Sequence, residues 1–195
     1  MAASPARAYT SAVVDEQLEF VKQIAERLAS AGIPYMMTGS MAMAVYATPR
    51  MTRDVDLVVD CAPGDAPRIV SLFETDCYVD AEAVANAVRT HGMFNIIHNE
   101  WITKADFIVR KDDPYRETEF GRRREVDAAG VRLSVVAPED LILSKLVWAR
   151  ETGSELQRRD VRELFASVTN LDWSYLERWA AHVGVSRELE QARRP

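Results

Sequence analysis

The pattern of hydrophobic and polar positions divides the chain into amphipathic helices and short buried strands. Between residues 15 and 31, apolar residues recur mostly at spacings of three and four, which is the period of an amphipathic helix. Gly32 and Pro34 break helices, so they end this one. The apolar run at residues 35–37 follows at once and predicts a buried strand.

The next segment predicts a turn, a helix and a second strand. Gly39 and Ser40 follow the first strand, and residues 41–45 have helical spacing. Ser40 is expected to cap this helix, whose N–H groups and positive dipole end would form an anion site. The second strand begins with Asp54 and Asp56, which project from the same face because successive strand residues point to opposite faces.

Helices and strands continue to alternate in the rest of the chain. Helical spacing occurs at residues 68–74, 81–89, 139–150, 155–167, 172–183 and 186–192, and strand-type runs occur at residues 94–98, 101–109 and 131–136. The strand-type runs at residues 94–98 and 101–109 have the pattern of a hairpin. The predicted fold class is therefore α/β, with a mixed sheet flanked by helices and a helical C-terminal region. We place the core with its N-terminal helix at residues 1–136 and the C-terminal region, packed on it or continuous with it, at residues 137–195.

Composition is that of an ordinary globular protein. The 195 residues are 48% hydrophobic and 28% charged, which is enough for one sizeable core. The formal net charge of −6 argues against a general binder of nucleic acid and leaves a local basic channel open. Cys61 and Cys77 form no Cys-x-x-Cys motif and are expected to be reduced. Because no run reaches membrane-spanning length and no signal-peptide pattern occurs, we expect a cytoplasmic protein.

Two adjacent motifs carry the candidate chemistry. One divalent cation could bridge Asp54 and Asp56, and a phosphate at the Gly39-Ser40 turn would be its neighbour. A Gly-Ser turn followed by an Asp-x-Asp strand resembles the signature of the nucleotidyltransferase superfamily with the DNA polymerase beta fold. This family also has a third carboxylate on a later strand, and Asp106 is in a matching place.

Two later segments are similar to those of the AbiEii-type nucleotidyltransferases. They are PEDLILSKLVWAR from residue 138 and RRDVREL from residue 158, and they place Lys145, Arg150 and Asp160 in matching positions. The resemblance implies that these three residues, with Gly39 and Ser40, bind the nucleotide. Lys145 would meet a phosphate, and Asp160 would orient Lys145 through an ion pair.

The resemblance implies a metal-dependent transfer of a nucleoside monophosphate from a triphosphate to an acceptor hydroxyl, with release of pyrophosphate. Asp54 and Asp56 would hold the metal that carries the triphosphate and share a second ion with Asp106. Asp106 could also accept the proton of the hydroxyl. Hard oxygen ligands favour Mg²⁺ or Mn²⁺ over zinc. The implied acceptor is RNA such as a tRNA 3′ end, a protein or a small molecule, and the AbiEii likeness adds a toxin–antitoxin role.

Each motif also has an ordinary structural explanation. An Asp-x-Asp pair is usually solvated at a strand edge, and a Gly-Ser turn is usually only a helix cap. A non-catalytic nucleotide-binding module, or an antitoxin or regulatory partner on the same fold, therefore stays open beside the enzyme. Transfer of the terminal phosphate is disfavoured because the chain has no P-loop motif.

Several charged and aromatic residues allow two interpretations. Lys145 either extends to the surface or points into a cleft. The three arginines at residues 122–124 form either a solvated helix end or a basic patch for triphosphate or RNA. The histidines lack metal-ligand spacing, so the first two are expected to be ordinary surface or half-buried residues and the third to be structural. Three tryptophans could stack on bases but are expected to pack in the core. These are His91, His98 and His182, and Trp148, Trp173 and Trp179.

Overall fold

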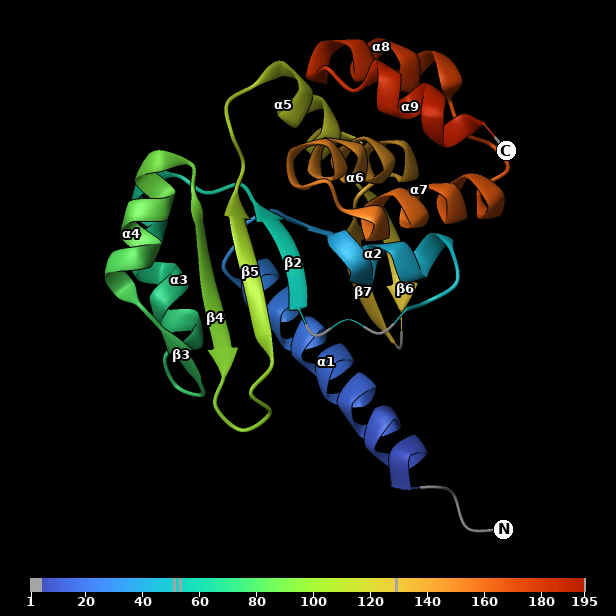
Figure 1. Cartoon of the computed structure of the whole chain (residues 1–195). Helices are drawn as coiled ribbons and strands as arrows, with labels where there is room; N and C mark the ends of the chain where they lie inside the picture. The colour runs from blue at the N-terminus through green and yellow to red at the C-terminus, as the bar shows by residue number, and fades with distance from the viewer. Residues whose placement is uncertain (1–4, 51, 53, 129, 195) are drawn as a thin grey trace. The chain divides into compact units, whose positions relative to one another are not determined.

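The computed structural model describes residues 5–50, 52, 54–128 and 130–194, with side chains described from Glu16 onward (Figure 1). Within this part of the chain there are nine α-helices and seven strands, which confirms the predicted mixed α/β class with a helical C-terminal region. The helices are α1 (Pro5–Ser30), α2 (Gly39–Tyr46), α3 (Ala66–Phe73), α4 (Ala81–Thr90), α5 (Pro114–Gly121), α6 (Pro138–Thr152), α7 (Glu155–Ser167), α8 (Trp173–Val183) and α9 (Ser186–Arg193). The strands are β1 (Tyr35–Thr38), β2 (Asp54–Val59), β3 (Cys77–Val79), β4 (Met93–His98), β5 (Lys104–Val109), β6 (Arg124–Ala128) and β7 (Val131–Val135).

The chain groups into two compact units. The first comprises Met1–Tyr35, Thr52–Arg110 and Asp127–Leu133, and the second comprises Met36–Met51, Lys111–Val126 and Ser134–Pro195. The expected boundary between residues 136 and 137 stays a prediction. No helix among the described residues has both the length and the hydropathy that a membrane crossing requires.

The first unit contains a sheet with strand order β3-β4-β5-β2. β3, β4 and β5 pair antiparallel, as the predicted hairpin requires, and β2 lies parallel to β5. Alternate residues of β2 point inward, because Val55, Leu57 and Val59 have no exposed surface. Helices α3 and α4 pack together beside β3 and β4, and α1 contacts α3 (Figure 1). Asp54 and Asp56 lie on the opposite, less buried face of β2.

The second unit contains the C-terminal helices and the pairing of β1 with β7. The two strands are parallel, with Met37 opposite Val135, and β6 is the neighbour of β7 on its other side. Helix α6 is buried over most of its length and packs against α7, α8 and α2 (Figure 1). It begins with Pro138, whose fixed φ suits a first helical position, and ends at Gly153 in the left-handed conformation.

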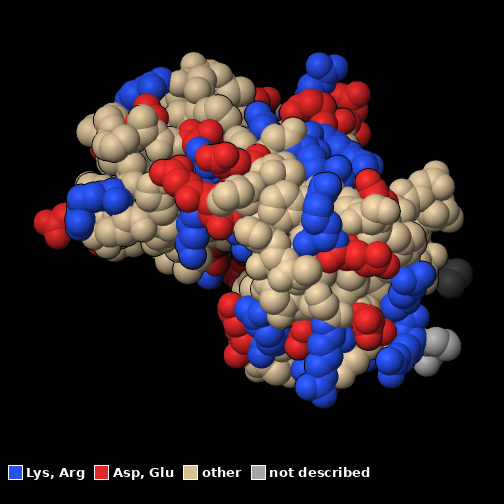
Figure 2. Space-filling model, turned by 90° about the horizontal axis from the view of Figure 1, so that it is seen from above, with Lys and Arg blue, Asp and Glu red and all other residues tan. Residues whose placement is uncertain are grey.

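Two short strands were not expected from the sequence. β3 has only three residues, and β6 is the charged segment REVDA, whose residues are exposed or half-buried. Each lies at an end of the strand order, where charge and shortness protect an edge from further pairing. On the face shown in Figure 2, Lys and Arg are interspersed with Asp and Glu.

Candidate functional site

The first candidate group is the set of carboxylates on β2 and β5. Asp54 and Asp56 alternate with the buried Val55 and Leu57, so both lie on the same face of β2, as expected. The parallel register sets Asp56 directly opposite Asp106. Adjacent strands are about 4.8 Å apart, so the structure brings the three predicted carboxylates together on one face of this unit.

Lys104 lies among these carboxylates. It is opposite Asp54 in the register, and its Nζ is 2.8 Å from Asp106 Oδ2 and 3.6 Å from Asp54 Oδ1. The hydrogen bond to Asp106 raises the pKa of Lys104. No role was predicted for Lys104 from the sequence. Its position two residues before Asp106 nevertheless places both side chains on the same face of the strand, which could have indicated the contact.

The donor set fits a hard divalent cation in its chemistry. Carboxylate oxygens are the ligands that Mg²⁺ and Mn²⁺ prefer. As the described side chains stand, however, no three His, Cys, Asp or Glu residues are arranged to hold a metal ion. The cation that lies on Asp54 and Asp106 is the Lys104 ammonium. Binding of a metal by this group therefore requires Lys104 to move aside.

The second candidate group belongs to the other unit and begins at the Gly39-Ser40 turn. Gly39 has a φ of +66°, a conformation that disfavours residues with a side chain. The expected cap at Ser40 is wrong, because the N-cap residue is Thr38 and makes no side-chain cap bond. The helix starts two residues earlier than a cap at Ser40 would allow, so Ser40 lies within α2, and its hydroxyl accepts a hydrogen bond from Arg50 Nη2.

Asp160 connects this turn to α6 and α7. Lys145 Nζ lies 2.7 Å from Asp160 Oδ2, with the two side chains only 4% and 2% exposed. Gln157 Oε1 also accepts from Lys145 Nζ, at 3.1 Å. The Arg50 guanidinium also donates to Asp160. Lys145 thus points inward at Asp160 instead of extending to the surface, and the expected Lys145–Asp160 ion pair is present.

Arg150, the remaining expected nucleotide-binding residue, lies elsewhere on α6. Its Nη1 donates to the carbonyl oxygens of Val183 at 3.0 Å and Gly184 at 2.8 Å, and its Nη2 is 3.7 Å from a carboxylate oxygen of Glu151. The structure therefore joins Arg150 to the end of α8 and does not bring it to the group around Asp160. Its role toward a nucleotide stays a prediction.

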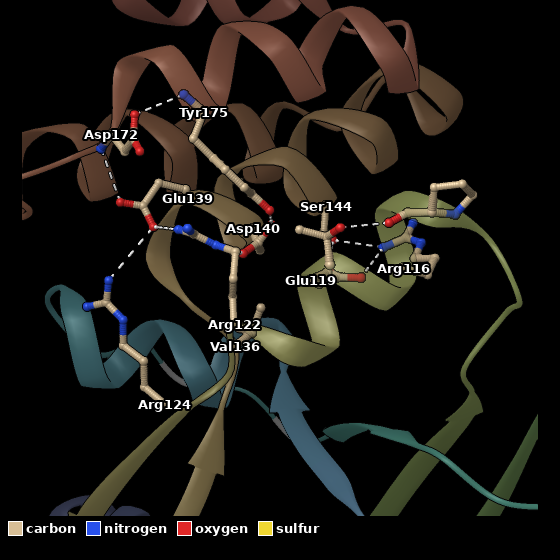
Figure 3. Close-up of polar contacts among 12 residues, drawn as sticks. Arg116, Glu119, Arg122, Arg124, Val136, Glu139, Asp140, Ser144, Asp172 and Tyr175 are labelled. Carbon is tan, nitrogen blue, oxygen red and sulfur yellow. Dashed lines mark hydrogen bonds and ion pairs between the residues drawn. The ribbon is translucent and has the colours of Figure 1, made fainter.

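Arg122 belongs to neither of the two environments expected for residues 122–124. Its Nη2 is 2.8 Å from Glu139 Oε2 and its Nε is 3.1 Å from Asp140 Oδ2 (Figure 3). Its guanidinium carbon also lies 3.8 Å from the centre of the Tyr175 ring. Glu139 and Asp140 are 2% and 0% exposed. Arg122 therefore neutralises buried carboxylates within the second unit.

A second ion pair lies beside this one (Figure 3). Glu119 accepts from Arg116 Nη1 at 2.7 Å and from the Ser144 hydroxyl at 3.0 Å, and it is 2% exposed. Burial raises the pKa of Glu119 and of Asp140, although arginines oppose the shift at both. We refer to Arg116, Glu119, Arg122, Glu139, Asp140 and Tyr175 as the buried ion cluster.

The expectation of a surface or half-buried position is wrong for His98, which is 5% exposed and stacks on Trp101 with ring centroids 4.0 Å apart. His91 ends α4 in the left-handed conformation. The expectation of core packing is wrong for Trp148, which is 53% exposed on α6. Cys61 and Cys77 are free thiols, as expected, and burial raises the pKa of each to about 11.

Comparison with protein-family models gives no match, and comparison with curated proteins gives none. Solved structures do match. An antigenic nucleotidyltransferase-like protein from Paracoccidioides brasiliensis is 18% identical, with a TM-score of 0.57 over 91% of this chain and 92% of that one. The solution structure of the antibiotic-resistance factor ANT(2″)-Ia is 15% identical, with a TM-score of 0.55 over 92% and 93% of the two chains. ANT(2″)-Ia in complex with adenylyl-2″-tobramycin is 17% identical, with a TM-score of 0.50 over 91% and 98%. The chain therefore has the fold of these nucleotidyltransferase-like proteins.

Proposed function

We propose that this protein is a metal-dependent nucleotidyltransferase that moves a nucleoside monophosphate from a nucleoside triphosphate to an acceptor hydroxyl and releases pyrophosphate. The observation that carries the proposal is the set of Asp54, Asp56 and Asp106 on one face of two adjacent parallel strands. The fold shared with nucleotidyltransferase-like proteins supports it.

Asp54, Asp56 and Asp106 are the residues that would hold Mg²⁺ or Mn²⁺. The metal, when bound, would neutralise charge on the triphosphate and lower the pKa of the attacking hydroxyl. Asp106 is half-buried on the neighbouring strand, and we assign to it acceptance of the hydroxyl proton. Phosphoryl transfer mainly requires that the protein positions the reactants and neutralises charge on the triphosphate, and these side chains can contribute to both.

The group around the Gly39-Ser40 turn is assigned to the phosphates. Gly39 allows the backbone to turn, and Ser40 offers a hydroxyl to an anion. The Lys145 ammonium is only 4% exposed beside Asp160, so its proposed contact with the anion requires this buried pairing to open. Asp160 is nearly fully buried and ion-paired, so its proposed role is to orient Lys145. Arg150 keeps the nucleotide-binding role that the resemblance implies, and that role requires its contacts with α8 to open.

The acceptor class is the open part of the function. The neighbour ANT(2″)-Ia was solved with an adenylylated aminoglycoside, which favours a small-molecule hydroxyl. The AbiEii likeness of residues 138–150 and 158–164 favours instead RNA, such as a tRNA 3′ end, or a protein, within a toxin–antitoxin pair. ATP is the first nucleotide to test, because ANT(2″)-Ia was solved in complex with an adenylyl compound.

A label-transfer assay tests the proposal. Purified protein is incubated with Mg²⁺ and each nucleoside triphosphate labelled at the α-phosphate, together with cellular RNA, lysate proteins and an aminoglycoside panel. We expect label in one acceptor class and a loss of at least about a hundredfold in Asp54→Ala. Asp60→Ala, which removes a half-buried carboxylate paired with Arg110 directly after the same strand, is the matched control and should transfer label normally.

The assay also tests the alternative. The Lys104 ammonium on Asp54 and Asp106 is the observation that favours a non-catalytic nucleotide-binding module, since it offsets charge that a metal would use. If no acceptor class is labelled but calorimetry still detects nucleotide binding, a non-catalytic nucleotide-binding module is the better description of the protein.

A further inference from the structure

Arg50 connects the Ser40 hydroxyl with the Asp160 carboxylate. Its Nη2 donates to Ser40 Oγ and, at 3.1 Å, to Asp160 Oδ2, while its Nε donates to Asp160 Oδ1 at 3.1 Å. The guanidinium side chain is 23% exposed and the carboxylate 2% exposed, so these contacts are largely shielded from water. One planar side chain therefore holds groups from α2 and α7 at once.

Asp160 is shared by two cations. The same oxygen, Oδ2, accepts from Lys145 Nζ at 2.7 Å and from Arg50 Nη2 at 3.1 Å. The contact of Arg50 with Ser40 places these two cations near the start of α2, where backbone N–H groups also favour an anion.

We propose that Arg50 is a positioning residue of the phosphate-binding group. Its guanidinium fixes the Ser40 hydroxyl directly and fixes the buried Lys145 ammonium through the shared Asp160, so that both are held in place for a phosphate of the nucleotide. The identity of this ligand rests on the proposed function. Lysine cannot replace Arg50 fully, because an ammonium is a point charge and cannot hold the carboxylate and the hydroxyl in one plane.

Binding of inorganic tripolyphosphate, measured by calorimetry without metal, tests the inference independently of catalysis. We expect the wild-type protein to bind, Arg50→Met to bind at least about tenfold more weakly, and Arg50→Lys to fall between them. Arg27→Met is the matched control. Arg27 also forms a two-contact pair with a carboxylate, Asp76, at 2.8 and 2.5 Å, and this pair belongs to the first unit.

Kinetics separate positioning from a purely structural role. If Arg50 acts through Ser40, then Ser40→Ala should weaken tripolyphosphate binding much less in an Arg50→Met background than in the wild-type protein. In an active enzyme, Arg50→Met should raise KM for the triphosphate, and Arg50→Lys should restore part of the loss. Circular dichroism and the melting temperature show that each variant is folded, and Arg50→Lys decides the question if Arg50→Met does not fold.

The outcomes distinguish this inference from the proposed function. Arg50 variants that bind tripolyphosphate as the wild type does, even if their melting temperature is lowered, would overturn the inference. A wild-type protein that binds no tripolyphosphate would overturn it as well. If tripolyphosphate binding depends on Arg50 while no acceptor is ever labelled, the transferase proposal fails and the positioning role stands.

Discussion

At Lys104 a cationic side chain lies on two of the carboxylates that are proposed to bind metal. Strand geometry accounts for this, because Lys104 and Asp106 share a face of β5 and Asp54 is opposite Lys104 on β2. The ammonium lowers the repulsion among carboxylates when no metal is bound. It also competes with a divalent cation for the same oxygens.

Replacement of Lys104 by methionine should therefore strengthen metal binding. We expect Lys104→Met to bind Mn²⁺ about three- to tenfold more tightly than the wild type, since one competing charge is removed from a partly exposed site. Electron paramagnetic resonance of free Mn²⁺ measures this. Lys22→Met, which removes an ammonium paired with Glu19 on α1, is the control. Unchanged or weaker Mn²⁺ binding would contradict the competition.

The elements of the second unit are held together by the buried ion cluster. Arg122, from the segment after α5, neutralises Glu139 and Asp140 at the start of α6, and the Tyr175 hydroxyl of α8 donates to Asp140 at 2.6 Å. Buried charges are stable only when they are paired, so this cluster depends on every partner being present.

Removal of the arginine should therefore destabilise the protein strongly. Arg122→Ala leaves Glu139 and Asp140 buried without their main cation, which should lower the free energy of unfolding by about 3 kcal/mol. Urea unfolding measures the loss. Arg132→Ala, whose side chain is 73% exposed, should change stability by less than about 0.5 kcal/mol. Equal effects of the two substitutions would contradict a stabilising role for the cluster.

The cluster should also give stability a characteristic pH dependence. Burial raises the pKa of Glu119 above its ordinary value of 4.5, so the folded state holds this proton more tightly than the unfolded state does. The contribution to stability is complete below pH 4.5 and is lost as the pH rises through the folded-state pKa. The stability of the wild type relative to Glu119→Gln should therefore fall as pH increases across this window.

Urea unfolding at a series of pH values measures this difference. Glu117→Gln, on the exposed face of the same helix, is the matched control and should show a nearly constant difference from the wild type. If the stability of the wild type relative to Glu119→Gln rises with pH instead, the attraction of Arg116 lowers the pKa of Glu119 by more than burial raises it.

On the scale of the whole molecule, folding and proposed catalysis should differ in their need for metal. The described residues contain no group arranged as a metal site, and Lys104 already offsets charge at the candidate carboxylates. We expect EDTA to abolish nucleotidyl transfer while the melting temperature changes by less than about 2 °C. Scanning calorimetry with and without EDTA, followed by readdition of Mg²⁺, checks both parts. A large loss of stability would indicate a structural metal.

Sequence periodicity was sufficient for most elements, because it records which residues face a core. The runs that became β2, β4 and α7 were predicted nearly to the residue, whereas β5 begins three residues later than its predicted run. The common face of Asp54 and Asp56 followed from the alternation of β2 alone. Periodicity failed for β3 and β6, where short or charged edge strands bury too little to leave a pattern.

What only the tertiary structure decided is which side chain meets which. Asp106 opposite Asp56 depends on the β2–β5 register, and Arg50 meets Asp160 although 110 residues separate them. The Lys145–Asp160 pair was expected from the family resemblance and not from the spacing of residues. The position of Arg122 is likewise decided by the packing of α5, α6 and α8 and not by its place in a run of arginines. The sequence by itself determined the elements and the face on which each residue lies, since these depend on local spacing. The pairing of charges needed the three-dimensional fold, because attraction between two side chains acts through space and leaves no periodic trace along the chain.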